Sequence, residues 1–166
     1  MRECSRILTR IWLRLVVPGV LTAAVPLAGS GTGQARPAYY LTDPIGGYAI
    51  GGHDPVAYFV DRRARLGDRR FEHQWRGVKW LFVNEGNRAA FERSPEVYVP
   101  QYTGCGAYAL AEGYATAGNP AIFAILDGRL YFFHSVVNRF LFIIELESTT
   151  TQADANALKT GCSPRL

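Results

Sequence analysis

Cysteine and histidine, which supply many of the ligands for transition metals in proteins, are scarce in this chain. Its 166 residues include three of each. None of them falls into a Cys-x-x-Cys, His-x-x-x-His or His-Glu-x-x-His spacing. A tight zinc site normally takes about four ligands, often from paired spacings of this kind. The sequence therefore excludes the common zinc motifs and leaves only a site assembled from scattered ligands.

Familiar catalytic and nucleotide-binding motifs are also missing from the sequence. It has no Gly-x-Ser-x-Gly nucleophile elbow, no Walker loop and no dinucleotide fingerprint. Cys105, which lies between two glycines, is the candidate nucleophile, but a nucleophilic thiol needs a neighbouring base. A lone thiol is also open to oxidation outside the cytoplasm. We therefore expect a protein that is not an enzyme, with thiol chemistry at Cys105 as the alternative.

Excess positive charge is confined to the N-terminal part of the chain. The net charge of the whole chain is +4, and its first 35 residues hold four arginines and one glutamate. Of 18 basic and 14 acidic residues, 14 and 13 remain beyond this segment, a net charge of +1. Nucleic-acid-binding domains normally carry a strongly basic face, so we expect no nucleic-acid partner.

Residues 1–35 have the organisation of a secretory signal peptide. Arginines precede an apolar run over residues 15–28, which is shorter than the roughly 20 residues that span a bilayer. Residues 33–35 offer a cleavage site, and an uncleaved anchor is the alternative. We expect a periplasmic or secreted protein with a surface segment over residues 36–47 and no stable membrane span after cleavage.

The two cysteines outside this segment, Cys105 and Cys162, form an even pair in an oxidising compartment. A disulfide between them would close a long loop, which stabilises a fold by on the order of 4 kcal/mol in the chain-entropy model. Two separate thiols are the other interpretation that the sequence leaves open.

Turn and capping signals indicate an α+β fold of small antiparallel hairpins and capped helices. Asp127-Gly128 is a strong hairpin signal, and Asn84, Ser135 and Thr150 or Thr151 are suitable N-caps. The expected strands cover residues 48–52, 71–75, 78–83, 122–126 and 130–133. The expected helices cover residues 84–93, 107–112, 135–147 and 152–159. Many aromatic residues lie in these elements, and we expect most of them to form the core.

The chain also contains a faint internal repeat at an offset of 51 residues. The offset places Gly77 on Gly128, Trp80 on Tyr131, Phe82 on Phe133, Asn84 on Ser135, Asn87-Arg88 on Asn138-Arg139, and Phe91 on Phe142. Each copy reads as a turn, an aromatic strand, a cap and a helix. The pattern predicts two hairpin–helix units on one core, although any hairpin followed by a capped helix gives some matches of this kind.

Several motifs in order resemble the exported YHS-domain proteins of bacteria. The matching segments run from Gly47 to Phe59, which includes Asp54-Pro55-Val56-Ala57, and from Phe82 to Tyr98, Pro100 to Ala107, Asp127 to Tyr131, and Ala153 to Ala157. The resemblance places a YHS-like domain over residues 48–160, followed by a tail over residues 161–166. Ala57, Val83 and Asn87 stand where metal-binding members carry thiols. In the family's equivalent of the third segment, Pro100 to Ala107, the thiol lies one place later than Cys105.

The resemblance implies a binding module, and its ligand would be a metal ion such as copper. Imidazole and sulfur suit copper, so His134, His53 and Cys105 are the candidate ligands; the internal repeat aligns His134 with Val83. Each histidine also has a plainer interpretation: a solvated His53, His73 on the outer face of a strand, and His134 bonded near a helix start. The alternative function is a metal-free structural or protein-interaction domain that has lost its cysteine ligands.

Overall fold

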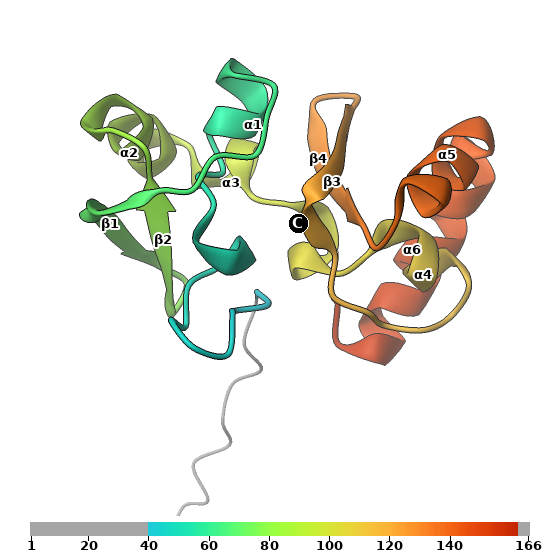
Figure 1. Cartoon of the computed structure of the whole chain (residues 1–166). Coiled ribbons are helices and arrows are strands. Elements are labelled where there is room, and N and C mark those ends of the chain that lie inside the picture. The colour runs from blue at the N-terminus through green and yellow to red at the C-terminus, as the bar shows by residue number, and fades with distance from the viewer. Residues whose placement is uncertain (1–39, 163–166) are drawn as a thin grey trace, which may run out of the picture. The chain divides into compact units, whose positions relative to one another are not determined.

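A computed structural model of the chain describes residues 40–162 (Figure 1). The expected signal peptide, most of the surface segment and residues 163–166 of the tail lie outside these residues. The described part has the α+β class expected from the sequence, with two separate antiparallel hairpins and the helices that follow them. None of the helices between residues 40 and 162 is long and apolar enough to cross a membrane.

Each hairpin belongs to a unit of the same element order. The first unit contains η1 (Ile50–Gly52), α1 (Ala57–Val60), β1 (Asp68–Trp75), β2 (Val78–Phe82), α2 (Glu85–Arg93) and α3 (Pro95–Tyr98). The second contains η2 (Gln101–Gly104), α4 (Ala107–Ala111), β3 (Asn119–Leu126), β4 (Arg129–Phe133), α5 (Val136–Ile144) and α6 (Leu146–Thr160).

The two units repeat one another closely, as the sequence predicted. Adding 51 to the bounds of β1, β2 and α2 gives the bounds of β3, β4 and α5. Both hairpins carry an irregularity after their first paired residue, Asp68 in one and Asn119 in the other. The predicted caps are confirmed: Asn84 accepts a hydrogen bond from the Asn87 N–H at 2.8 Å, and Ser135 accepts one from the Asn138 N–H at 3.1 Å.

The repeat extends further upstream than the sequence showed, at an offset of 52 residues. Residues 50–52 and 102–104 each form a run of three left-handed residues. The Asp54 N–H donates to Arg65 O at 2.8 Å, and the Gly106 N–H donates to Thr116 O at 2.9 Å. This left-handed turn corrects the predicted strand over residues 48–52, because positive φ is incompatible with an extended strand.

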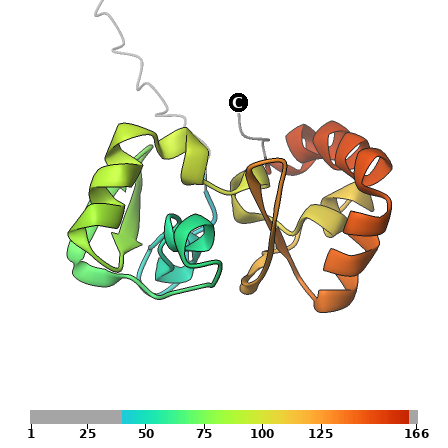
Figure 2. The ribbon, with the colours of Figure 1, turned by 90° about the horizontal axis from the view of Figure 1, so that it is seen from above.

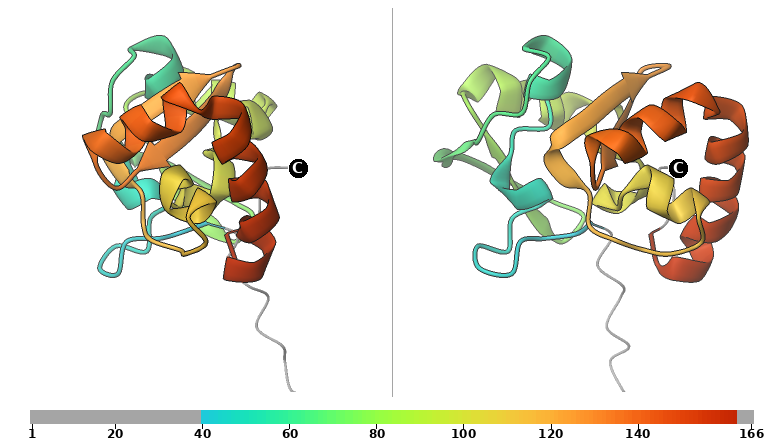
Figure 3. Two further views of the ribbon diagram at one scale, coloured as in Figure 1. Left: turned by 90° about the vertical axis from the view of Figure 1, so that its right-hand side faces the viewer. Right: turned by 45° about the vertical axis from the view of Figure 1, so that its right-hand side comes forward.

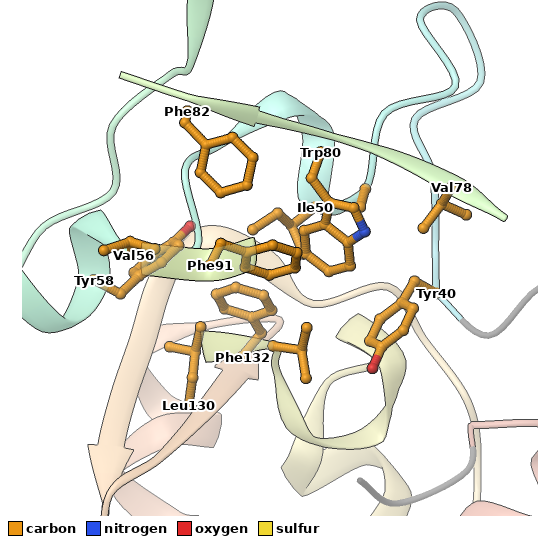
Figure 4. Packing of buried hydrophobic residues seen from close by; sticks show 12 residues of the cluster. Tyr40, Ile50, Val56, Tyr58, Val78, Trp80, Phe82, Phe91, Leu130 and Phe132 are labelled. Carbon is orange, nitrogen blue, oxygen red and sulfur yellow. The ribbon is translucent and has the colours of Figure 1, made fainter. Parts of the chain in front are cut away.

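The strand β4 serves two hydrophobic clusters because its side chains alternate between its faces. Leu130 and Phe132 join the first cluster, around Trp80 and Phe91, whereas Tyr131 and Phe133 join the second, around Phe142. Figure 4 shows Leu130 and Phe132 among the rings of the first unit. Figure 2 shows α4, α5 and α6 on the other side of this hairpin.

Three further predictions need correction. The predicted helix over residues 135–147 ends at Ile144, and α6 begins at Leu146. The last helix is therefore not capped by Thr150 or Thr151: the Thr151 hydroxyl donates to Glu147 O inside α6 at 2.8 Å, a common competitor of capping for threonine. Within the expected surface segment, Tyr40 is buried, and its ring lies 5.0 Å from that of Trp80.

Candidate functional site

The carboxylate of Asp54 is the centre of the most densely bonded polar cluster in the first unit. One oxygen, Oδ1, accepts from the N–H groups of Val56 at 2.8 Å and Ala57 at 3.2 Å. The other, Oδ2, accepts from the Val83 N–H at 2.8 Å and from the Asn87 amide at 2.7 Å. Asp54 is fully buried, and a carboxylate is stable in such a place only when donors replace its water.

The cluster joins three elements of the first unit at one point. Val56 and Ala57 belong to the start of α1, Val83 follows β2, and Asn87 lies in the first turn of α2. Ala57, Val83 and Asn87 are the positions where the resemblance to YHS domains would place thiols. The structure brings these positions together around a carboxylate whose two oxygens already accept from four protein donors, and the side chains of Ala57 and Val83 have no atom that could ligate a metal.

The second unit lacks the carboxylate at the matching place. Gly106 corresponds to Asp54, His134 to Val83 and Asn138 to Asn87 by the offsets of the repeat. A Cβ at Gly106 would lie 3.2 Å from Thr116 Oγ1 and 3.5 Å from the His134 N. Thr116 Oγ1 is buried and has no hydrogen-bond partner among the described residues, and the Asn138 Oδ1 accepts instead from the Ser135 hydroxyl at 2.9 Å.

Replacing Gly106 by aspartate is expected to stabilise the protein relative to alanine at this position, because the new carboxylate could accept from N–H groups at the start of α4, as Asp54 accepts from those of Val56 and Ala57. Gly106 is already the N-cap of α4, with extended backbone (φ −70°, ψ 115°) and no side-chain cap. An aspartate N-cap stabilises a helix by about 1 kcal/mol relative to alanine, but by only a few tenths of this relative to glycine. Urea unfolding of G106D against G106A measures the gain, since the alanine variant adds the same Cβ without the carboxylate. Equal stability of the two variants would contradict the equivalence of the sites.

Cys105 and Cys162 form a disulfide, with their Sγ atoms 1.99 Å apart. The sequence left open a disulfide or two separate thiols, and the structure has the disulfide. Both residues are buried, and the bond connects the residue before Gly106 with the residue after Gly161, the C-cap of α6. In this state Cys105 has no thiol or thiolate to offer as a metal ligand or nucleophile.

The histidines lie in different surroundings. His53 is half-buried, with Nδ1 3.1 Å from Ile50 O. His73 lies in β1, with Nδ1 3.2 Å from a carboxylate oxygen of Glu92, and His134 is exposed after β4. Among residues 40–162, no group of three or more histidine, cysteine or acidic side chains could hold a metal ion. The suggested set of His134, His53 and Cys105 is thus not assembled in this arrangement.

Two buried tyrosines form long-range hydrogen bonds: Tyr58 joins the first unit to β3 of the second, and Tyr102 joins η2 to α6 within the second unit. The Tyr58 hydroxyl donates to Pro120 O at 3.0 Å, and burial, with the charge of Asp54 as a smaller cause, raises the pKa of Tyr58. The Tyr102 hydroxyl donates to Asp154 at 2.8 Å, and burial together with this carboxylate raises the pKa of Tyr102. Both hydroxyls therefore stay protonated donors at neutral pH, which favours a structural role.

The most unusual surface of the described residues is the outer face of α5. All five exposed side chains of this helix are large and apolar: Val136, Val137, Phe140, Ile143 and Ile144, with 41 to 62% of each accessible to solvent. We call these five residues the α5 stripe. In Figure 3, left, the side of the molecule that carries α5 and α6 faces the viewer.

The repeat shows that this surface is particular to the second unit. The residues of α2 that align with the α5 stripe are Glu85, Gly86, Ala89, Glu92 and Arg93. In α2, Arg88 forms ion pairs with Glu85 at 2.6 Å and Glu92 at 3.5 Å. In α5, Val136 and Ile143 stand where α2 has these two glutamates. The matching arginine, Arg139, donates instead to Phe123 O at 3.3 Å. One copy of the helix thus has a polar outer face and the other an apolar one. A position-by-position comparison of the two copies would have revealed this from the sequence.

Comparison with known proteins adds no relative: no family model, curated protein or solved structure matches the chain.

Proposed function

We propose that this chain is an exported, non-enzymatic binding domain with a YHS-like frame that folds without a metal ion and binds protein. The observation that carries the proposal is the convergence of positions 57, 83 and 87 on the Asp54 carboxylate. Hydrogen bonds to one buried acid take the place that, by the resemblance, a bound metal would hold in the family. The alternative, copper held by His134, His53 and Cys105, would require reduction of the disulfide and a different arrangement of the histidines.

The α5 stripe is the surface that we assign to protein binding. Contiguous exposed apolar surface costs free energy in water, and on soluble monomers a patch of several hundred Å² commonly marks an interaction site. On the equivalent helix of the first unit, α2, the outer face carries charged side chains that pair with one another. The same frame therefore accommodates a polar outer face, and the frame itself does not require the apolar residues of α5.

Metal analysis of the purified protein tests the metal-independent frame. We expect far less than one equivalent of copper or zinc after dialysis, and the same melting temperature with and without EDTA, because the described donors around Asp54 are all protein groups. The histidine variants H134A and H53A, with H73A as the matched control, should melt alike under both conditions. One equivalent of metal that is lost in H134A but kept in H73A would overturn the proposal in favour of copper.

A further inference from the structure

The α5 stripe is symmetric along its helix. Taking Phe140 as the centre, the other members lie three and four residues before it and three and four residues after it. In a helix these spacings fall on one face. A twofold axis through Phe140 would therefore place Val136 and Val137 of one helix against Ile143 and Ile144 of an antiparallel copy, with the two Phe140 rings at the centre.

The charges at the ends of α5 favour the same antiparallel pairing. The helix has no acidic residue in its first turn and no basic residue in its last turn, whereas Glu145 and Glu147 are exposed just beyond its C-terminal end. Negative charge is unfavourable beside a helix's own C-terminus and favourable beside an N-terminus. In an antiparallel pair, Glu145 of each copy lies near the N-terminal end of its partner's α5, where His134 is exposed.

The area of the α5 stripe suits a small dimer interface. With roughly half of each of five large side chains exposed, the stripe offers on the order of 500 Å² of apolar surface. Two copies would bury on the order of 1,000 Å², about the lower limit for a specific interface. The interface would be centred on an aromatic residue, as binding energy often is.

We infer that the partner of the α5 stripe is a second copy of this chain, bound through an antiparallel α5–α5 contact about a twofold axis at Phe140. This inference rests on the proposed binding function and names its partner. The contact is isologous, because the same face serves both copies, and it closes on itself without leaving a second surface that could continue into a filament.

Sedimentation equilibrium of the full chain tests this dimer. The wild type is expected to approach twice the monomer mass at about 100 µM and to dissociate on dilution, as a small interface should. The variant V136E/I143E transfers the acidic residues of α2 to α5, where Arg139 is placed to pair with them as Arg88 does. It should stay folded, melt at the temperature of the dilute, dissociated wild type, and sediment as a monomer at the same concentration.

Two controls separate the α5 stripe from other sources of association. L158E changes a residue that is 72% exposed on α6, outside the stripe, and should remain dimeric. V136E/I143E retains the apolar run of residues 15–28, so association through that run would leave it oligomeric and overturn the inference. As a second measurement, F140C should form a covalent dimer under mild oxidation much faster than L158C.

A monomeric wild type, whether or not it binds lipid vesicles or other proteins, overturns the self-pairing. That result would not contradict the proposed metal-independent binding domain. Conversely, stoichiometric metal in the purified protein would overturn the metal-independent domain but would not change the mass measured for the dimer. The two proposals therefore fail separately.

Discussion

The variant D54A is expected to lose about 3–5 kcal/mol of its free energy of unfolding, a large part of the total for a domain of this size. Removal of the carboxylate leaves the N–H groups of Val56, Ala57 and Val83 and the amide of Asn87 without their acceptor. Asp54 is fully buried, so water has little access to these donors. Each unpaired buried donor costs about 1–3 kcal/mol, and partial relaxation reduces their sum.

Urea unfolding followed by tryptophan fluorescence measures this loss, because Trp80 lies in the hydrophobic cluster of the same unit. Asp43 provides the matched control: its carboxylate also accepts from backbone N–H groups, including those of Ile45 and Tyr48 at 3.0 Å. It is only half-buried, so water can replace the acceptor, and D43A should lose much less stability than D54A. A similar small loss for D54A would show that the cluster does not hold the first unit together.

Two further variants resolve the cluster into its parts. D54N keeps the size of the side chain, but its amide has one oxygen that can accept hydrogen bonds, and its NH₂ group would face two of the four donors. Most of the stability lost in D54A should therefore also be lost in D54N. N87A removes one donor and leaves three, which should cost about 1–2 kcal/mol. D54N as stable as the wild type would mean that shape, and not acceptance by two oxygens, is what the site requires.

The sequence predicted the two hairpins and the starts of α2 and α5 because their signals are local. Asp127-Gly128 forms the turn of the second hairpin, with positive φ at both residues. Asn84 and Ser135 cap α2 and α5 by accepting from the N–H group three residues further along the chain. The break between α5 and α6 was missed. Glu145, at the break, carries no glycine or proline signal, although its backbone is non-helical (φ −123°, ψ 42°).

The role of Asp54 could not be predicted, because its partners are distant in the chain. Val83 and Asn87 lie 29 and 33 residues away from it, and locally Asp54-Pro55 looks like an ordinary turn. The sequence did single out positions 57, 83 and 87, but only for the thiols that they lack. The carboxylate joins these positions only because the end of β2 lies beside the start of α1, which no local pattern in the sequence indicates.

Loss of the Cys105–Cys162 disulfide is the second change expected to have a large effect. The bridged residues are 57 positions apart, and opening a loop of that size costs about 4 kcal/mol through the added entropy of the unfolded chain. The hydrophobic cluster around Phe142 contains both cysteines together with residues of α4 and α6. Side-chain contacts between these helices, such as the Asn156 amide to Leu110 O at 3.0 Å, would have to hold the end of α6 alone.

Urea unfolding of the wild type and of C105A/C162A, each with and without a thiol reductant, measures the contribution of the bridge. The reductant should destabilise the wild type by about 4 kcal/mol and leave the double variant unchanged. Hydrogen exchange should accelerate most in α6, whose C-terminal end the bridge fastens, and least in α2, which packs in the other hydrophobic cluster. Two freely titrating thiols in the native protein, or equal exchange in both helices, would contradict this assignment.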